Sequence, residues 1–397
     1  MGYGTVGSGV IEVLQTNKER IDQRAGDEIH VKYILDLRDF PGDPYENKVI
    51  HDFNTILHDD SVTIVCETMG GVGAAYQFTK QALERGKSVC TSNKELVAKH
   101  GPELLQIARE HNCNYLFEAS VGGGIPIIRP LNYSLTAEKI EAINGILNGT
   151  TNYILSKMEK EGADFAAVLK EAQDKGYAER NPEADVEGYD ACRKIAILSS
   201  LMFSKNVDSE KVPTEGITKI TAADFEYANA TDHTIKLLGR SRAIDDNTAE
   251  VMVAPFLLSK EHPLAMVHGV FNAVFVTGNM LGDSMYYGRG AGKLPTASAV
   301  VSDVVDCARH QGKVIMCFWD KEEVKLADIG EAERSFFIRA KAGAEDAVTA
   351  AFPGGRMVHL KDRKEDFGYF TQSMKEKDFQ AKYEALGGQM LGRIRLV

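Results

Sequence analysis

The chain begins with MGYGTVGSGV at residues 1–10, and this stretch determines how the first third of the sequence is interpreted. Gly2, Gly4 and Gly7 have the spacing GxGxxG, in which glycines permit a tight turn, close approach of the backbone to a pyrophosphate and close packing of a helix on a sheet. Apolar residues at helical spacing follow, and the N-terminus of such a helix offers unpaired N–H groups to a phosphate. The stretch therefore predicts a dinucleotide site formed by Gly2, Gly4, Thr5, Val6 and Gly7, although alone it also fits a glycine-rich turn.

Strand-like and helix-like segments alternate through the residues that follow. Strands are expected at 30–35, 61–68, 87–93 and 114–120, with helices at 74–86 and 95–111. This alternation favours the dinucleotide interpretation and predicts an α/β domain over 1–125, with a Rossmann-type, doubly wound parallel sheet. The helical segment 296–312 is expected to return to that domain.

Only Met1 precedes the first glycine, whereas this motif is expected to follow a β-strand. Either the recorded start lies too late or the sheet lacks its central strand. In the second case neighbouring strands would lose ladder partners and leave a hydrophobic slot. We expect an apolar strand of about six residues, added before Met1, to raise thermal stability and tighten dinucleotide binding.

After residue 125 the pattern changes. A strand is expected at 139–149, helices at 150–162, 164–176 and 190–203, and antiparallel strands between 249 and 288. We predict an α+β substrate-binding, catalytic and dimerisation domain over 126–320, because the open face of such a sheet often packs against a second copy in a homodimer or homotetramer. A linker at 321–333 leads to a tail, 330–397, whose βαββαβ order is typical of a small ferredoxin-like domain.

Composition limits the class of partner. The net charge of −11 argues against nucleic acid or an anionic membrane, both of which need a basic footprint, and favours a small-molecule substrate. The six cysteines show no CxxC spacing and are interpreted as reduced thiols. No apolar run reaches the roughly 18 residues of a spanning helix, and no signal-peptide pattern is present at the start, so we expect a cytoplasmic protein.

Three short stretches follow predicted strands, where ligands bind in such sheets. Asp36 and Arg38 end the second strand; the acid would hold a ribose 2′-hydroxyl and the arginine a 2′-phosphate, so NAD and NADP both stay open, with a slight preference for NADP. Lys94 could reach a cofactor or substrate, or be a solvated lysine at a helix start. In FEASVGGGIP, the Glu118 carboxylate and freed carbonyls could meet a hard cation, although such a run is more often a hinge.

The densest polar cluster lies between residues 176 and 194. Glu179, Asp185 and Asp190 are close in sequence, and Asp190 and Lys194 share one helix face. Carboxylates of this kind could hold an ammonium group and a hydroxyl while the lysine transfers a proton. The alternative is a solvated acidic loop with a helix salt bridge, against which the apolar residues after Lys194 predict a largely buried helix.

Together these motifs resemble the homoserine dehydrogenase family over essentially the whole chain, and the tail resembles the ACT domain of bacterial members. The matching stretches, in order, are GYGTVGSGV, TSNKELVAKHG, FEASVGGGIPII, LNGTTNYIL, GYAERNPEADVEGYDACRKIAIL and GRGAGKLPTASAVVSD.

The resemblance implies NAD(P)-linked interconversion of L-homoserine and L-aspartate 4-semialdehyde in threonine and methionine biosynthesis. Lys194 matches the catalytic acid/base, with Asp190 beside it. The implied substrate-binding residues are Gly176, Glu179, Asp185 and Asp190. The implied cofactor contacts beyond the first motif are Arg38, Lys94, Gly290 and Gly292, and the implied sodium ligands are Glu118 and the carbonyls of Val121, Gly123 and Ile125. An amino acid such as threonine is the expected effector at the tail.

Two other classes fit fewer of these residues. One is a different NAD(P)-linked aldehyde or hydroxy-acid dehydrogenase. The other is a regulatory homologue with impaired cofactor binding, suggested by the missing strand and the ACT-like tail, but the retained Lys94, Glu179, Asp190 and Lys194 count against it.

Overall fold

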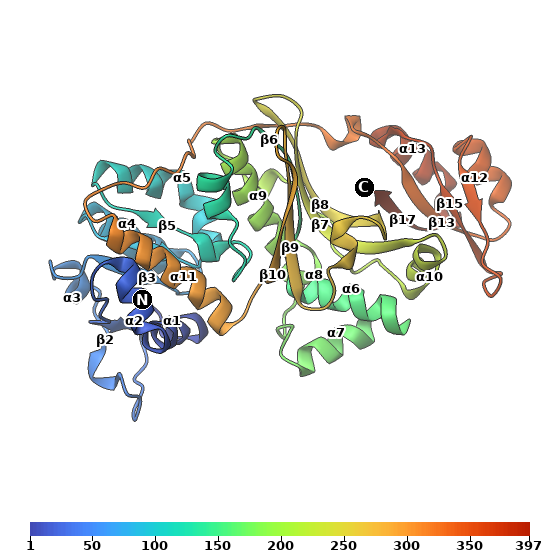
Figure 1. Ribbon diagram of the computed structural model, residues 1–397. Helices are drawn as coiled ribbons and strands as arrows, with labels where there is room; N and C mark the ends of the chain where they lie inside the picture. Colours follow the sequence, from blue (N-terminus) through green and yellow to red (C-terminus); the bar gives the residue numbers. More distant parts are fainter. The chain divides into compact units, whose positions relative to one another are not determined.

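The computed structural model describes residues 1–397, which divide into two compact units (Figure 1). Unit 1 comprises residues 1–140, 196–210 and 277–324, and unit 2 comprises 141–195, 211–276 and 325–397. The segments 1–125 and 296–312 therefore fall in unit 1, whereas the tail from residue 330 falls in unit 2.

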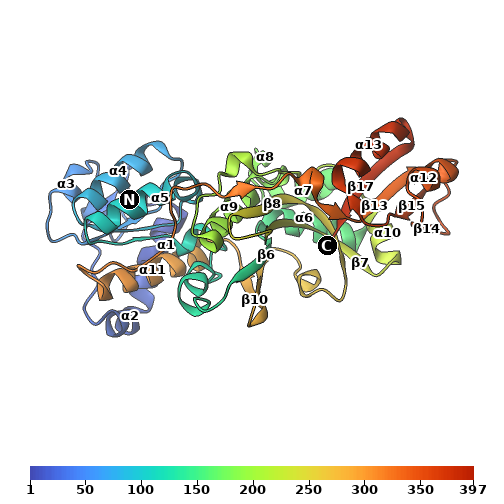
Figure 2. The same ribbon diagram turned by 90° about the horizontal axis from the view of Figure 1, so that it is seen from above.

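Unit 1 is built on parallel strands with helices on both sides, which confirms the predicted α/β class. Its parallel strands are β1 (Ile34–Leu35), β2 (Val49–Ile50), β3 (Ile64–Glu67), β4 (Ser88–Thr91) and β5 (Tyr115–Leu116). Its helices are α1 (Thr5–Thr16), α2 (Lys18–Ala25), α3 (Asn54–Leu57), α4 (Gly73–Glu84), α5 (Lys94–Glu110) and α11 (Lys293–Arg309). Strand β10 (Gly282–Arg289) also falls in this unit but is not part of the parallel sheet. Figure 2 shows α4 and α5 on one side of the parallel strands, and α1, α2 and α11 on the other.

The parallel sheet is split into two pieces. One piece pairs β1 with β2, and the other has the order β3-β4-β5. A cavity of about 310 Å³ lies between them, lined by apolar side chains that include Val10, Ile34 and Val304. Residues 30–33, expected as strand, lie outside β1, which pairs with β2 only at Ile34 and Leu35.

Met1 and Gly2 bridge the two pieces at the carboxyl ends of their strands. The Gly2 N–H donates to the Leu35 carbonyl at 2.8 Å, and the Thr68 N–H donates to the Met1 carbonyl at 2.9 Å. The Met1 amino group donates to the Cys66 carbonyl at 2.7 Å. The hydrophobic slot expected between neighbouring strands is therefore present as the 310 Å³ cavity, and the glycine turn closes one end of it.

Helices α1 and α11 pack closely enough to form one core with the sheet. Gly9 of α1 lies against Lys293 and Ala297, where an added Cβ would already crowd both residues. Val10, Val300 and Val304 are at most 5 % exposed in this core, and each such burial stabilises the fold by about 1.5–3 kcal/mol.

Unit 2 carries a mixed sheet in the order β9-β6-β7-β8-β17-β13-β15-β14, with β11 beside β8. Its first part comprises β6 (Ile140–Ile146), β7 (His233–Ala243), β8 (Thr248–Ser259) and β9 (Phe271–Gly278), with helices α6 (Gly149–Glu161), α7 (Phe165–Asp174), α8 (Glu183–Val186), α9 (Tyr189–Phe203) and α10 (Ala222–Ala230). The division between the units falls within α9. Strand β7 was not anticipated, because Lys236, Gly239, Arg240 and Arg242 interrupt its apolar pattern.

The tail has the predicted βαββαβ order. Its main elements are β13 (Phe336–Lys341), α12 (Glu345–Ala351), β14 (Arg356–Val358), β15 (Asp366–Phe370), α13 (Glu376–Leu386) and β17 (Met390–Leu396), and its short strands are β11 (Lys325–Leu326), β12 (Glu333–Arg334) and β16 (Met374–Lys375). Phe336 and Phe379 stack in its core with ring centroids 3.6 Å apart. Because β17 pairs in parallel with β8, at Arg395 opposite Phe256, the tail extends the sheet of unit 2.

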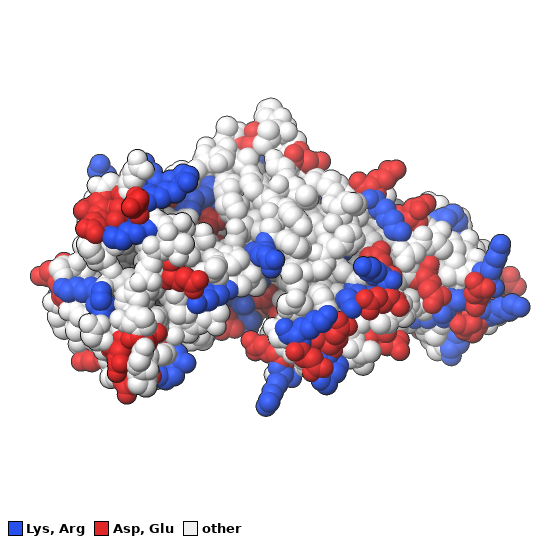
Figure 3. Space-filling model, turned by 60° about the horizontal axis from the view of Figure 1, so that its bottom comes forward, with Lys and Arg blue, Asp and Glu red and all other residues white.

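None of the helices combines the length and the apolar character that a membrane span requires. On the face drawn in Figure 3, basic and acidic side chains are interspersed and do not separate into a continuous basic patch.

Candidate active site

The glycine motif forms the turn into α1. Gly2 has φ +84°, a conformation that favours glycine, and a Cβ on Gly7 would overlap the Gly2 carbonyl. The Ser8 N–H donates to the Gly4 carbonyl at 3.0 Å, so the N–H groups of Thr5, Val6 and Gly7 precede the first hydrogen bond of the helix. A Cβ on Gly4, by contrast, would meet nothing within 4 Å. This cradle fits a dinucleotide pyrophosphate, which needs open space above glycine and free N–H donors.

Asp36 and Arg38 lie at the end of β1, as expected. The Asp36 carboxylate accepts hydrogen bonds from the Tyr3 N–H in the glycine turn (2.7 Å) and from Arg38 Nε (2.9 Å). These contacts, chiefly the Arg38 guanidinium, hold the pKa of Asp36 well below its usual range despite partial burial. The Arg38 side chain is 62 % exposed. Because Asp36 contacts both Tyr3 and Arg38, the two charged groups adjoin the glycine turn that would hold the cofactor.

A second glycine turn precedes α11. Gly292 caps the helix with φ +121°, and a Cβ on Gly123 would overlap the Gly290 carbonyl. The Gly124 N–H donates to the Arg289 carbonyl at 3.1 Å. The structure thus brings GRGAG beside VGGG, and Lys293 at the start of α11 forms an ion pair with Glu12 of α1 at 2.7 Å.

Glu118 is 2 % exposed, and its carboxylate accepts hydrogen bonds from three backbone N–H groups. The carboxylate accepts from Ile127 (2.6 Å), Ile128 (3.0 Å) and Arg129 (2.8 Å). Burial nevertheless raises the pKa of Glu118. The carbonyl oxygens of Val121, Gly123 and Ile125 accept no hydrogen bond in the structure, so they are the groups here that could face a cation.

Lys94 is the first residue of α5, and only Ser92 and Asn93 separate it from β4. Asn93 caps this helix, its Oδ1 accepting from the Leu96 N–H at 3.1 Å, and its Nδ2 donates to the Gly71 carbonyl at 2.7 Å. The cap fixes Lys94 at the carboxyl edge of the parallel sheet, where such folds bind ligands.

In unit 2, Lys194 is held at the start of α9. Its side chain is buried, and Nζ donates to Asp190 Oδ2 and to the Leu147 carbonyl, each at 2.7 Å. Asp190 is the residue one turn earlier on the same helix, as the spacing predicted. The pair can hold a proton, with a donor and an acceptor adjoining it inside the protein.

Asn148 connects the predicted carboxylates, and sequence reasoning missed it. Its Nδ2 donates to Asp185 Oδ1 at 2.7 Å and to Asp190 Oδ2 at 2.8 Å, while its Oδ1 accepts from the Thr151 N–H and caps α6. The signal was present in LNGTTNYIL, where an asparagine stands directly before a predicted helix.

Glu179 and Gly176 lie in the exposed loop between α7 and α8. Thr150 Oγ1 donates to the Tyr177 carbonyl at 2.7 Å, and Gln173 Nε2 donates to the Glu179 carbonyl at 3.0 Å. The loop is thus attached to the start of α6, but no hydrogen bond joins the Glu179 carboxylate to the Lys194 cluster.

A dinucleotide cradle on a Rossmann-type sheet, together with a buried lysine–carboxylate pair in an α+β unit, defines a nicotinamide-dependent oxidoreductase. Comparisons with known proteins then specify the family. Residues 126–305 match the family described as homoserine dehydrogenase, and residues 2–118 match the homoserine dehydrogenase NAD binding domain.

Individual relatives agree. The chain is 45 % identical over 312 residues to homoserine dehydrogenase from Bacillus subtilis, covering 77 % of this chain and 71 % of the relative. A homoserine dehydrogenase crystal structure from Thiobacillus denitrificans has a TM-score of 0.91 at 36 % identity, covering 100 % of this chain and 96 % of the other. A hyperthermophilic archaeal homoserine dehydrogenase in complex with NADPH has a TM-score of 0.65 at 29 % identity, covering 77 % and 95 %.

The chain belongs to the homoserine dehydrogenase family, and it is an NAD(P)-dependent oxidoreductase acting on a CH–OH group. Participation in amino-acid biosynthesis follows from that reaction. Neither alternative, a different dehydrogenase or a regulatory homologue, finds support in these comparisons.

Proposed function

We propose that Lys194 is the acid/base of the reversible conversion of L-homoserine to L-aspartate 4-semialdehyde. The observation that carries the proposal is the position of Lys194 Nζ, which is buried and 2.7 Å from both Asp190 and the Leu147 carbonyl. The nicotinamide, when bound, supplies or accepts the hydride. In reduction, the Lys194 ammonium donates a proton to the new alkoxide and stabilises its charge; in oxidation, the neutral amine accepts the hydroxyl proton.

The carboxylates around Lys194 have a separate role. Asp190 orients Lys194 through their direct hydrogen bond, and Asn148 holds Asp190 and Asp185 together. Asp185, Glu179 and the backbone at Gly176 would receive the polar groups of the substrate. Glu179 suits an ammonium group, because its carboxylate forms no hydrogen bond within the protein and lies on an exposed loop.

For the cofactor, we propose a slight preference for NADP over NAD. The cradle residues are Gly2, Gly4, Thr5, Val6 and Gly7, with Lys94 and the Gly290–Gly292 turn as further contacts. Arg38 supports NADP, since its exposed guanidinium at the end of β1 can turn from Asp36 to a 2′-phosphate. Sodium is proposed at the free carbonyls of Val121, Gly123 and Ile125; the occupied Glu118 carboxylate would support that loop through its hydrogen bonds.

At a larger scale, we propose dinucleotide binding by residues 1–125 with 296–312, and substrate binding and dimerisation by 126–320. The tail, 330–397, is proposed as an ACT-like regulatory domain that responds to an amino acid such as threonine, in a cytoplasmic homodimer or homotetramer. Its support is the βαββαβ order around a phenylalanine core.

Steady-state kinetics test the proposed reaction and cofactor together. Homoserine oxidation is measured with NADP and with NAD, and lactate and malate serve as control substrates. We expect turnover with homoserine alone and a lower KM for NADP. Equal rates with a control substrate would contradict the substrate assignment, and a lower KM for NAD would contradict the cofactor preference.

A further inference from the structure

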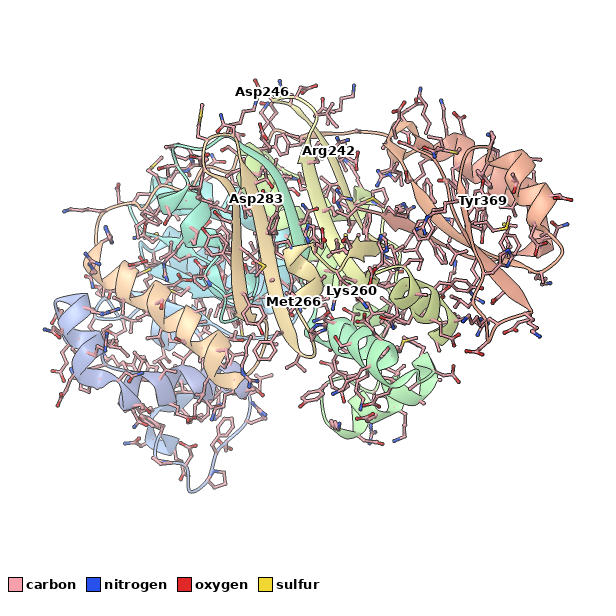
Figure 4. All side chains as sticks on the ribbon, turned by 45° about the vertical axis from the view of Figure 1, so that its right-hand side comes forward. Arg242, Asp246, Lys260, Met266, Asp283 and Tyr369 are labelled. Carbon is pink, nitrogen blue, oxygen red and sulfur yellow. The ribbon has the colours of Figure 1, made fainter.

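An arginine of the tail contacts a carboxylate that lies outside the tail. Arg395, in the last strand β17, is 2 % exposed. Its Nε donates to both carboxylate oxygens of Glu376 on α13, at 3.0 and 3.1 Å. Its terminal nitrogens donate to Glu215, Nη1 to Oε2 at 2.9 Å and Nη2 to Oε1 at 2.7 Å. Figure 4 labels Arg242 on β7 and Tyr369 on β15, which lie on opposite sides of the β8–β17 junction where Arg395 is found.

The contact between Arg395 and Glu215 is a two-point ion pair. Two N–H···O bonds from one guanidinium fix the orientation of a carboxylate as well as its distance. Arg393 also approaches Glu215 Oε1, at 3.3 Å. Although partial burial raises the pKa of Glu215, the hydrogen bonds and charge of Arg395 outweigh it and lower the pKa to about 2. Glu215 is therefore ionised throughout the neutral pH range.

Glu215 belongs to a segment, residues 213–217, that pairs with β8 beside the tail. The Glu215 N–H donates to the Val253 carbonyl at 2.8 Å, and the Val253 N–H donates to the Pro213 carbonyl at 2.9 Å. Strand β17 pairs with β8 a few residues further on, with Arg395 opposite Phe256. The segment and β17 are thus consecutive partners of one strand, and the ion pair joins them.

The same segment packs against the end of α8 without intervening space. The Ile217 N–H donates to the Val186 carbonyl at 2.8 Å. A Cβ on Gly216 would lie 2.2 Å from that carbonyl oxygen, and a Cβ on Gly188 would lie 3.1 Å from the Thr214 side chain. Because backbone meets backbone at these positions, a displacement of the segment must displace the end of α8 as well.

Helix α8 contains Asp185, the residue directly before Val186. Asp185 Oδ1 accepts from Asn148 Nδ2, which also donates to Asp190 beside the catalytic lysine. We propose that Glu215 is a positioning residue for the substrate: held by Arg395 of the tail, it fixes segment 213–217 and so places the Asp185 carboxylate. The inference rests on the proposed role of Asp185 in substrate binding.

Steady-state kinetics of the full chain test the proposal, beginning with Glu215→Gln. This change removes the charge at a side chain that is 43 % exposed, so the variant should fold. We expect the KM for homoserine to rise roughly tenfold, while kcat and the KM for NADP stay within about twofold. Glu226→Gln is the matched control, because Glu226 is 50 % exposed and accepts from another tail arginine, Arg363, but lies on α10. Its KM for homoserine should equal that of the wild type.

A double-mutant cycle with Asp185→Asn distinguishes positioning from simple attachment of the tail. Asp185→Asn should itself raise the KM for homoserine, and adding Glu215→Gln should then raise it no further, because Glu215 acts through Asp185.

A normal KM in Glu215→Gln overturns the inference alone, provided that Asp185→Asn raises the KM. An equal rise in Glu226→Gln, or an undiminished effect of Glu215→Gln in the Asp185→Asn background, overturns it too. A normal KM in Asp185→Asn contradicts the proposed substrate role of Asp185, and the inference falls with it.

Discussion

Lys194 depends on a small number of neighbours, and each contributes a different property. Asp190 supplies charge, the Leu147 carbonyl supplies a fixed acceptor, and Asn148 fixes Asp190 from the start of another helix. Because all three contacts are 2.7–2.8 Å long and buried, a small displacement of one group changes the position of the others.

Replacement of the lysine should remove chemistry but not cofactor binding. We expect Lys194→Ala to lower kcat by about 10²–10⁴-fold, the usual contribution of an acid/base group. The Kd for NADPH, measured by fluorescence titration, should stay within a few-fold, since the cradle lies in the other unit. Lys175→Ala, which removes an exposed lysine paired with Glu171, is the control and should retain normal turnover. Unchanged turnover in Lys194→Ala would contradict its role.

Asn148 provides a second test at this scale. Asn148→Ala removes a helix cap, costing about 1 kcal/mol, and also releases Asp185 and Asp190. We expect kcat/KM for homoserine to fall roughly 10- to 100-fold, equivalent to about 1.4–2.7 kcal/mol. Thr221→Ala removes the capping box of α10 and should lower the melting temperature similarly while leaving kcat/KM unchanged. Equal kcat/KM losses in both variants would mean that Asn148 acts only through stability.

At the scale of elements, two glycines in the turn into α1 should affect different properties, one the stability of the fold and the other the binding of the cofactor. Gly7→Ala should lower the melting temperature by several degrees, because the new methyl group overlaps the Gly2 carbonyl. Gly4→Ala should leave the melting temperature almost unchanged but weaken NADPH binding by about tenfold, since its methyl group enters the space open to the pyrophosphate. Thermal melts and fluorescence titrations measure both effects. Normal NADPH affinity in Gly4→Ala would show that the pyrophosphate lies elsewhere.

Strand β7 contains a lysine whose burial makes stability depend on pH. Lys236 is 0 % exposed, its Nζ donates to the Val267 carbonyl at 2.7 Å, and burial lowers its pKa to about 8 against the weaker attraction of Glu159. Between pH 8 and about 10.5 the unfolded chain binds the proton that the folded chain has released, so this group makes stability rise with pH in that range.

Lys236→Met should therefore raise the free energy of unfolding at pH 7, by roughly 1–3 kcal/mol. The advantage should shrink as pH rises from 8 to about 10.5, which denaturant melts at several pH values would measure. Asn152 Nδ2 still donates to the Val267 carbonyl in the variant. A constant difference across this range would show that the lysine is charged in the folded protein.

For the whole molecule, the cavity between β1 and β3 predicts a response to an added strand. A fusion of about six apolar residues before Met1 should extend the ladder begun at Met1 and Gly2 and fill the 310 Å³ space. We expect a higher melting temperature and tighter NADPH binding, because the glycine turn gains a rigid anchor. A Gly/Ser fusion of equal length is the control. If the unmodified chain melts and binds NADPH as the apolar fusion does, the strand is dispensable.

Much of the molecule could be predicted from local patterns, and the exceptions share a cause. The α/β alternation, the tail order and the Asp190–Lys194 pair follow from spacing along the chain. Strand β7 did not, since its Lys236 and Arg240 are accommodated by partners distant in sequence, the Val267 carbonyl and Asn144. Likewise, the Glu118 carboxylate accepts hydrogen bonds because residues 127–129 fold back onto it, and the spacing of residues in the sequence does not indicate that fold.

The pairing of β17 with β8 has a consequence for the synthesis of the chain. Phe256 pairs with Arg395, which lies far along the chain, so the edge of β8 near Phe256 stays unpaired until the tail as far as Arg395 has left the ribosome. An apolar, unprotected strand edge in a nascent chain is a template for pairing with other chains. Slow translation of the tail would therefore prolong the exposure of β8, and chaperones that shield such edges should matter most before the final strand emerges.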